Sequence, residues 1–231
     1  MKKLFWIISV MFLLQACTTV QSVYFERLQP ADVNFPAQIR SVGVVNNMPP
    51  VHQDYKDVDY TSASLEGDGD IAAENLAQEL AAVDYFDQVV LYDKRVRKSA
   101  YPLEQPIPKE TVDELIRLLD VDMLLSMERV NVVLKDSTMF IPELYTFVPA
   151  AEGVVTSVVR AYLKQQEKPL FSIQKTDTLC WEIVQDLTFG DIVKDFSEYA
   201  ASIPMQYLLP YWKEEERREF DGGNVNMRGA G

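Results

Sequence analysis

The chain has 231 residues, of which 48% are hydrophobic, and a formal net charge of −13 at pH 7. Such an excess of acids repels nucleic acid and anionic lipid head groups, so neither is an expected partner. The apolar content, with only 9 glycines and 12 prolines, excludes an intrinsically disordered chain. A chain of this length can bury a core, and we expect a single folded domain at residues 24–212.

The first residues have the pattern of a secretion signal. Lys2 and Lys3 precede an apolar run at residues 4–14, which is shorter than the roughly 20 residues of a membrane-spanning helix. The next residues, "LQAC", resemble the lipobox of bacterial lipoproteins, in which the cysteine becomes the first mature residue and carries acyl chains. We therefore predict a signal peptide at residues 1–16 and lipidation of Cys17. The alternative is an ordinary signal peptide followed by a chance cysteine.

The residues after Cys17 predict where the anchored protein is located. Acyl chains contribute about 0.8 kcal/mol of membrane binding per buried CH₂, so several chains on one residue form a stable anchor. By resemblance to bacterial lipoproteins, Thr18 and Thr19 lack the aspartate that retains such proteins in the inner membrane. The first acid is Glu26, so no acidic run follows the cysteine directly. We expect a tether at residues 17–23 and an anchor in the outer membrane, on its periplasmic face.

The hydrophobic pattern predicts alternating strands and helices. Apolar, β-branched runs predict strands at residues 23–28, 39–45, 86–92, 121–134, 154–163 and 169–183. Apolar residues at helical spacing predict helices at residues 71–83, 108–119 and 191–209, with Asp70 as the first N-cap and a break or kink at Pro204. We expect an α/β (α+β) fold with a mixed β-sheet, two βαβ-like units, an antiparallel hairpin and packed helices.

Three segments carry a resemblance to known envelope proteins. They are "IRSVGVVNN", "AAENLAQELAAVDYFDQVVLYD" and "VDELIRLLDVDMLLSMERV". They resemble the α/β core of the N-terminal domain of the Tol-system periplasmic protein, of the curli-secretion lipoprotein and of the penicillin-binding-protein activator lipoproteins. Those proteins have a glycine-containing step before the third strand, where this chain has Leu119-Asp120-Val121-Asp122. The resemblance implies the mixed α/β fold that the hydrophobic pattern also predicts.

The whole chain also resembles an uncharacterised lipoprotein family of Gram-negative anaerobes. The segments "FPAQIRSVGVVNN" and "LLPYWKEEERREF" carry this likeness. Such proteins usually continue into a helical, tetratricopeptide-like region. The resemblance therefore implies that the charged tail at residues 213–231 is the start of such a region in a truncated chain. We expect residues 213–219 to extend the last helix on the surface. The family contributes no activity and no catalytic residue.

The chain has two cysteines, so lipidation of Cys17 would leave Cys180 without an intramolecular partner. Cys180 lies in "TLCW", inside a predicted strand. Unpaired cysteine is among the most buried residue types. We expect Cys180 to be a buried strand residue, and a reactive thiol is the alternative.

The polar segment at residues 48–70 contains the only histidine, His52, and the candidate metal ligands Asp54, Asp57, Asp59, Glu66, Asp68 and Asp70. Carboxylates bind hard cations, and the last three of these acids alternate as in a calcium-binding loop. An EF-hand would then need a glycine at Ile71 and a glutamate at Ala77. We therefore predict a solvated acidic loop without metal or cofactor. The chain has no hydrolase elbow, metalloprotease motif or P-loop, so we assign no catalytic residue.

An aromatic-rich segment at residues 139–149 lies between two predicted strands. Its large apolar residues are Phe140, Ile141, Leu144, Tyr145 and Phe147. One interpretation is that the segment continues the strands and packs into the core. The other is an exposed apolar surface that binds a partner or a membrane. Residues 130–134 do not alternate as a lipid-facing strand does over about ten residues, so we do not expect a pore.

Together these patterns predict a non-enzymatic, lipid-anchored envelope protein that presents an acidic domain to another protein in the periplasm. Its expected partners are the membrane, through the acyl anchor, and an envelope protein whose identity the sequence does not indicate. One alternative is a metal-dependent or hydrolytic enzyme that uses the loop at residues 48–70. Another is an oligomeric secretion component.

Overall fold

The computed structural model describes residues 19–50, 63–99, 102, 104–183 and 187–221. These residues divide into a compact unit, Ala31–Leu209, and a ribbon formed by the segments that flank it. Cys17, which we predict to be lipidated, lies outside the described residues, as do His52 and the acids Asp54, Asp57 and Asp59.

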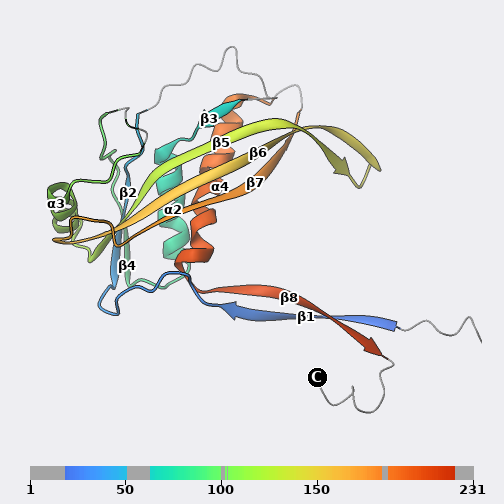
Figure 1. Ribbon diagram of the computed structural model, residues 1–231, viewed down its shortest axis with the longest axis horizontal. Helices are drawn as coiled ribbons and strands as arrows, with labels where there is room; N and C mark the ends of the chain where they lie inside the picture. Colours follow the sequence, from blue (N-terminus) through green and yellow to red (C-terminus); the bar gives the residue numbers. More distant parts are fainter. Residues whose placement is uncertain (1–18, 51–62, 100–101, 103, 184–186, 222–231) are drawn as a thin grey trace, which may run out of the picture. The chain divides into compact units, whose positions relative to one another are not determined.

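The compact unit is built on a six-stranded mixed sheet, which confirms the predicted fold class (Figure 1). The main order is β4 (Gln88–Leu91), β2 (Ser41–Asn46), β5 (Met123–Ile141), β6 (Thr146–Leu163) and β7 (Phe171–Glu182), and β3 (Ser64–Glu66) pairs with β5. β2 runs parallel to both β4 and β5. β6 and β7 form the predicted antiparallel hairpin, and β5 also pairs antiparallel with β6.

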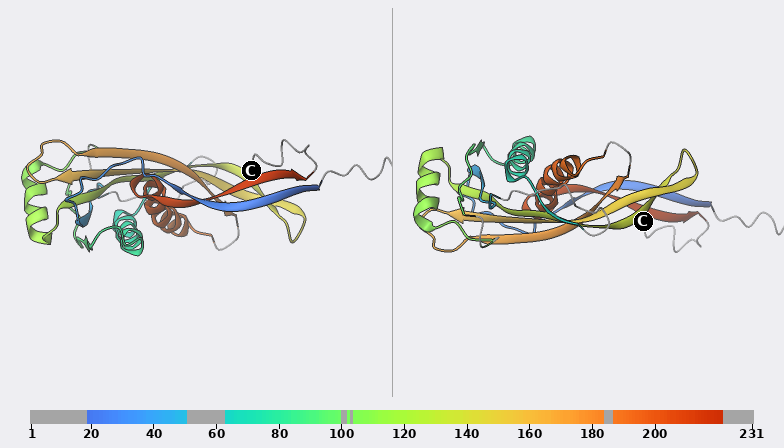
Figure 2. Two further views of the ribbon diagram at one scale, coloured as in Figure 1. Left: turned by 90° about the horizontal axis from the view of Figure 1, so that it is seen from below. Right: turned by 90° about the horizontal axis from the view of Figure 1, so that it is seen from above.

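Helices cover both faces of the sheet (Figure 2). α2 (Gly69–Ala82) and α4 (Phe189–Leu208) pack on one face, where Leu76, Leu80 and Phe196 are fully buried. α3 (Lys109–Leu119) packs on the other face and buries Val112. Because both faces of β2 are covered, its residues form a continuous apolar run instead of alternating with polar ones. No helix among the described residues is long and apolar enough to cross a membrane.

The N-cap of α2 differs from the predicted one, and that of α4 was not predicted. Asp68, and not Asp70, caps α2, because its side chain accepts hydrogen bonds from the backbone N–H groups of Asp70 (2.8 Å) and Ile71 (3.3 Å). The helix therefore begins at Gly69, whose backbone passes so close to β2 that an added Cβ would lie 2.5 Å from Asn46 Oδ1. α4 begins with a capping box formed by Thr188 and Asp191, a motif that we did not predict from the sequence.

Aspartates occupy the step from α3 to β5. Asp120 has a left-handed backbone (φ 54°), and its N–H donates to the carbonyl of Ile116 at the end of the helix. Asp122 accepts hydrogen bonds from the backbone N–H groups of Arg40 (2.8 Å) and Ser41 (2.9 Å). These bonds lower the pKa of Asp122 and join the starts of β2 and β5.

The ribbon consists of β1 (Thr19–Gln29) and β8 (Tyr211–Asp221), which pair antiparallel over their full length. Residues 19–23 of the segment predicted to form a tether, residues 17–23, therefore belong to a strand. The predicted helical extension at residues 213–219 is wrong, because these residues belong to β8. Glutamate, lysine and arginine favour a helix in isolation, but pairing with β1 overrides this preference.

Candidate functional site

The end of the β5–β6 hairpin extends past its neighbouring strands (Figure 1). β5 and β6 are paired from Met123 and Leu163 to Ile141 and Thr146. β7 pairs with β6 only at residues 150–161, and β3 pairs with β5 only at residues 131–133. Among the described residues, the last part of the hairpin is therefore a two-stranded ribbon with no third strand beside it.

This hairpin end carries the aromatic segment predicted as a candidate interaction surface. The exposed fractions are 41% for Phe140, 68% for Leu144, 87% for Tyr145 and 67% for Phe147, and Ile141 is half-buried. The strands continue through the segment, as one interpretation proposed, but these four side chains do not pack into the core. We call Phe140, Leu144, Tyr145 and Phe147 the hairpin patch.

Aromatic contacts hold the hairpin patch together. The ring centroid of Phe140 lies 5.6 Å from that of Tyr145 in an edge-on arrangement and 5.2 Å from that of Phe147. Such pairs contribute about 0.5–1.5 kcal/mol beyond their burial. The three rings therefore form one apolar surface instead of three separate side chains.

The turn at this end places a tyrosine in a costly conformation. The N–H of Tyr145 donates to the carbonyl of Pro142 (3.3 Å), and its backbone has a φ of 48°. Glycine adopts this left-handed region freely, whereas for other residues it costs about 1 kcal/mol. The chain thus keeps a large, 87% exposed side chain at a position where glycine would fold more easily.

A second candidate is a buried polar cluster where β5 bulges between Met127 and Arg129. The Glu128 side chain is fully buried and accepts hydrogen bonds from Asn47 Nδ2 (2.7 Å) and Tyr162 Oη (2.9 Å). It also pairs with Arg160 at 3.3 Å. Burial raises the pKa of Glu128, whereas the two hydrogen bonds and the Arg160 charge oppose this shift.

Ion pairs extend this cluster across three strands. Arg160 also contacts Glu104 (3.2 Å), and Arg129 contacts Glu66 (3.2 Å) and Glu104 (3.9 Å). Carboxylates and guanidinium groups alternate through the cluster, so that no two like charges form a pair in it. This arrangement joins β3, β5 and β6 to the segment that leads into α3.

The polar groups of Asn47, Tyr162 and Glu128 all bond to the protein's own backbone and side chains. Asn47 Nδ2 also donates to the carbonyl of Gln105 (2.8 Å), and Tyr162 Oη accepts from the N–H of Ile107 (3.2 Å). Both oxygens of Glu128 are engaged by the protein's own side chains. The sequence offered a signal for this cluster that we did not use: Glu128 and Arg160 interrupt otherwise apolar strands.

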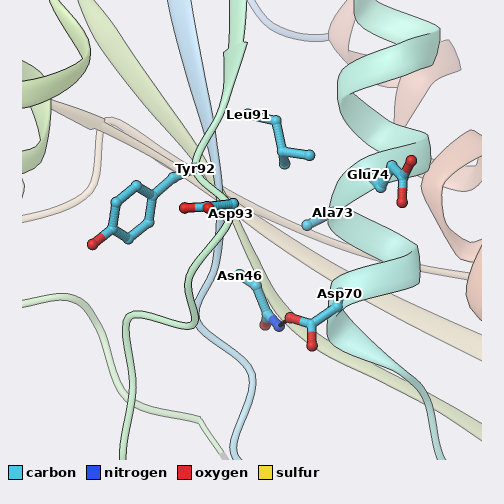
Figure 3. A pocket seen from close by; sticks show the side chains of 7 residues that line it. All are labelled: Asn46, Asp70, Ala73, Glu74, Leu91, Tyr92 and Asp93. Atoms are coloured by element: carbon cyan, nitrogen blue, oxygen red, sulfur yellow. Dashed lines mark hydrogen bonds between the residues drawn. The ribbon is translucent and has the colours of Figure 1, made fainter.

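A small pocket lies at the carboxyl ends of β2 and β4, beside the first turns of α2 (Figure 3). Its volume is about 180 Å³, and it is lined by Asn46, Asp70, Ala73, Glu74, Leu91, Tyr92 and Asp93. Open α/β sheets bind ligands at such strand ends. Here Asp70 is already bonded to Asn46 (2.6 Å) and paired with Arg95 (3.4 Å), and the Tyr92 ring points away from Asp70 and Glu74.

The structure places the three described candidate metal ligands in different roles. Glu66 pairs with Arg129, Asp68 caps α2 and Asp70 bonds Asn46. Within the described ranges, no group of three or more histidine, cysteine or acidic side chains is arranged to hold a metal ion. The remaining acids of the loop lie outside those ranges.

Cys180 has no disulfide partner and is exposed, so the prediction that it is buried is wrong. The strand itself is correctly predicted, as β7. Along β7, Ile173 and Trp181 are buried against the helix-covered face, while Cys180 points to the opposite face. Among the described residues, β7 contributes nothing to the apolar core on the α3 side of the sheet, so a residue type that is usually buried lies in solvent.

Comparison with known proteins identifies a family but no established activity. A family model described as "Domain of unknown function (DUF8603)" matches residues 39–220. A comparison with curated proteins found no match.

Two solved structures are among the similar ones. The PelC dodecamer from Paraburkholderia phytofirmans is 14% identical, with 81% of this chain and 94% of that chain covered and a TM-score of 0.36. A minor lipoprotein from Acinetobacter baumannii is 7% identical, with 76% of this chain and 98% of that chain covered and a TM-score of 0.31. These scores are too low to establish a common fold or a common role.

Proposed function

We propose that this chain, which belongs to the DUF8603 family, is a non-enzymatic, lipid-anchored envelope protein that binds another protein through its hairpin patch. The acyl anchor would be on Cys17, in the outer membrane and facing the periplasm. The exposed hairpin patch is the observation that carries the proposal, because contiguous apolar surfaces on folded domains mark interaction sites.

Three properties of the patch favour a protein partner. Tyrosine and phenylalanine are enriched at the centres of protein interfaces, where they contribute large contact areas. The rings of Phe140, Tyr145 and Phe147 are already grouped, so binding would order few further side chains. Tyr145 retains its side chain at a left-handed position, as expected if that side chain has a role outside the fold.

Site-specific photo-crosslinking in intact cells tests the binding role. A photoreactive residue at position 145 should capture one discrete protein. The matched control is position 118 on α3, because Leu118 is also apolar and is 64% exposed. The proposal predicts a crosslinked protein from position 145 and none of the same mass from position 118. Crosslinks to lipid alone, or the same diffuse products from both positions, would contradict it.

Membrane fractionation tests the anchor separately. Without the thiol of Cys17, no acyl chain can be attached, and the chain should no longer be held by acyl CH₂ groups that contribute about 0.8 kcal/mol each. The Cys17→Ala chain should therefore appear in the soluble fraction, whereas the Cys180→Ala control should stay with the membrane. Retention of the Cys17→Ala chain in membranes would overturn the anchor and leave the test of the hairpin patch unaffected.

A further inference from the structure

Over residues 23–28 of β1 and the paired residues 212–217 of β8, the ribbon has two faces of opposite charge. We propose that the acidic face of this part of one copy docks on the basic face of the same part of a second copy. This interaction would make the protein self-associate through a surface other than the hairpin patch. It does not rest on lipidation or on the partner of the hairpin patch.

The strand register defines the two faces, because directly paired residues point to the same side of a ribbon. The acidic face carries Tyr24, Glu26, Leu28, Trp212, Glu214 and Glu216. The basic face carries Val23, Phe25, Arg27, Lys213, Glu215 and Arg217. Among the side chains that the structure describes, the first set includes three acids and no base, and the second includes three bases and one acid.

Contacts within the ribbon agree with this assignment. On the basic face, Arg27 pairs with Glu215 at 3.3 Å, and Arg217 lies 5.0 Å from the centroid of the Phe25 ring. On the acidic face, Ser22 Oγ donates to Glu216 Oε1 at 2.5 Å. Each contact joins residues of one face, as the register requires.

Each face has a like-charge pair directly across the two strands. Glu26 is opposite Glu214 on the acidic face, and Arg27 is opposite Lys213 on the basic face. Like charges in directly opposed positions destabilise a strand pair. Because the two pairs occupy adjacent register positions, stacking one ribbon on another with a small offset brings the carboxylates over the cations. A second copy would thus relieve both repulsions at once.

Apolar side chains add a contact area to the charges. On the acidic face, Tyr24, Leu28 and Trp212 are 63%, 51% and 65% exposed. The basic face adds Val23, which is 41% exposed, and the half-buried ring of Phe25. A two-stranded ribbon is only marginally stable in water, and covering one face with a second sheet is the usual way to stabilise it.

The observations favour docking by faces instead of edges and favour a second copy as the partner. Charged side chains on both strands oppose pairing along the open edges. The two faces complement each other in sign, and the same chain supplies both. Contact between different faces of identical copies is heterologous, so it produces either a closed ring or an open chain of copies.

Native mass spectrometry of the full chain, extracted in detergent, tests the proposal. The unmodified chain should form multimers. The variants E26K/E214K and R27E/K213E should each raise the apparent dissociation constant by about tenfold or more, because each brings like charges together. The control E114K/E167K changes the net charge as E26K/E214K does, but at exposed sites of the compact unit, and should leave the multimers intact.

Two further measurements distinguish docking between copies from binding of the ribbon to a different protein. Mixing E26K/E214K with R27E/K213E should restore multimers that contain both chains, because each altered face again meets its opposite. Trp212→Ser, which leaves every charge in place, should also weaken association. A monomeric unmodified chain would overturn the proposal, as would multimers unaffected by either charge variant. Loss of multimers without recovery on mixing would also overturn it, since this indicates a different partner for the ribbon.

Discussion

The two halves of the β5–β6 hairpin contain similar residue types in opposite environments. In the helix-covered half, Leu125, Val130 and Val155 are completely buried. At the free end, Leu144, Tyr145 and Phe147 are more than 65% exposed. The difference is due to what lies over the strands: α2 and α4 cover the first half, and no described element covers the end. Apolar residues in a strand thus identify a core only where another element packs on them.

Removing a buried ring tests the helix-covered half and should have the largest effect. Phe196 is fully buried on α4 and packs against the sheet. Phe196→Ala should lower the free energy of unfolding by about 3–5 kcal/mol, because it removes apolar contacts and leaves a cavity. Urea unfolding measures this change. The matched variant Phe147→Ala, at the exposed end, should lower it by only about 0.5–1.5 kcal/mol, the contribution of its ring contact with Phe140. If both variants lost the same free energy of unfolding, the difference that we describe between the covered half and the free end would be wrong.

Adding a side chain at Gly153, where the helix-covered half of the hairpin ends, should lower the free energy of unfolding by an intermediate amount. An added Cβ at Gly153 would lie 2.5 Å from Val132 and 2.7 Å from the Trp181 ring. Both are constrained neighbours, on β5 and β7, so Gly153→Ala should cost about 1–3 kcal/mol of stability through overpacking. Thermal and urea unfolding would show it. A neutral result would mean that the strands separate easily at this position.

The buried cluster should show a pH dependence with a definite sign. Because burial raises the folded-state pKa of Glu128 above its ordinary value of 4.5, its contribution to stability is fully present below that value. The contribution is lost as the pH rises through the folded-state pKa. The free energy of unfolding of the unmodified chain, relative to Glu128→Gln, should therefore fall between about pH 4 and pH 7. Urea titrations at both pH values measure this difference, and a rise would contradict the assignment.

The sequence predicted the elements whose signal is local and long. The apolar runs of β2, β6 and β7 and the periodic helices α2 and α3 are found at or near the predicted residues. β3 has only three residues, too few for a pattern, and it is stabilised by pairing with β5. β8 contains helix-forming residues and is a strand because β1 lies beside it. Pairing between segments this far apart in the chain cannot be predicted from a short stretch of sequence.

The candidate site was predictable to a similar degree. The aromatic composition identified the five residues at the hairpin end. The same sequence pattern is consistent with these residues being buried in the core or exposed on the surface. The choice depended on whether a helix covers residues 139–149, which is a property of the whole fold. The cluster around Glu128 was missed because it joins Asn47, Glu104 and Arg160, which are far apart in the sequence.

The smallest expected change in stability gives the most direct test of the role of the hairpin patch. Replacing Tyr145 with glycine relieves the left-handed backbone but also removes the ring contact with Phe140. Because these two effects are of similar size and opposite sign, the free energy of unfolding should change by less than about 1 kcal/mol. The same change removes the most exposed ring of the patch. The decisive measurement is the yield of the protein crosslinked from position 144, which should fall at least tenfold in this stable variant. An undiminished yield would contradict the role that we assign to the patch.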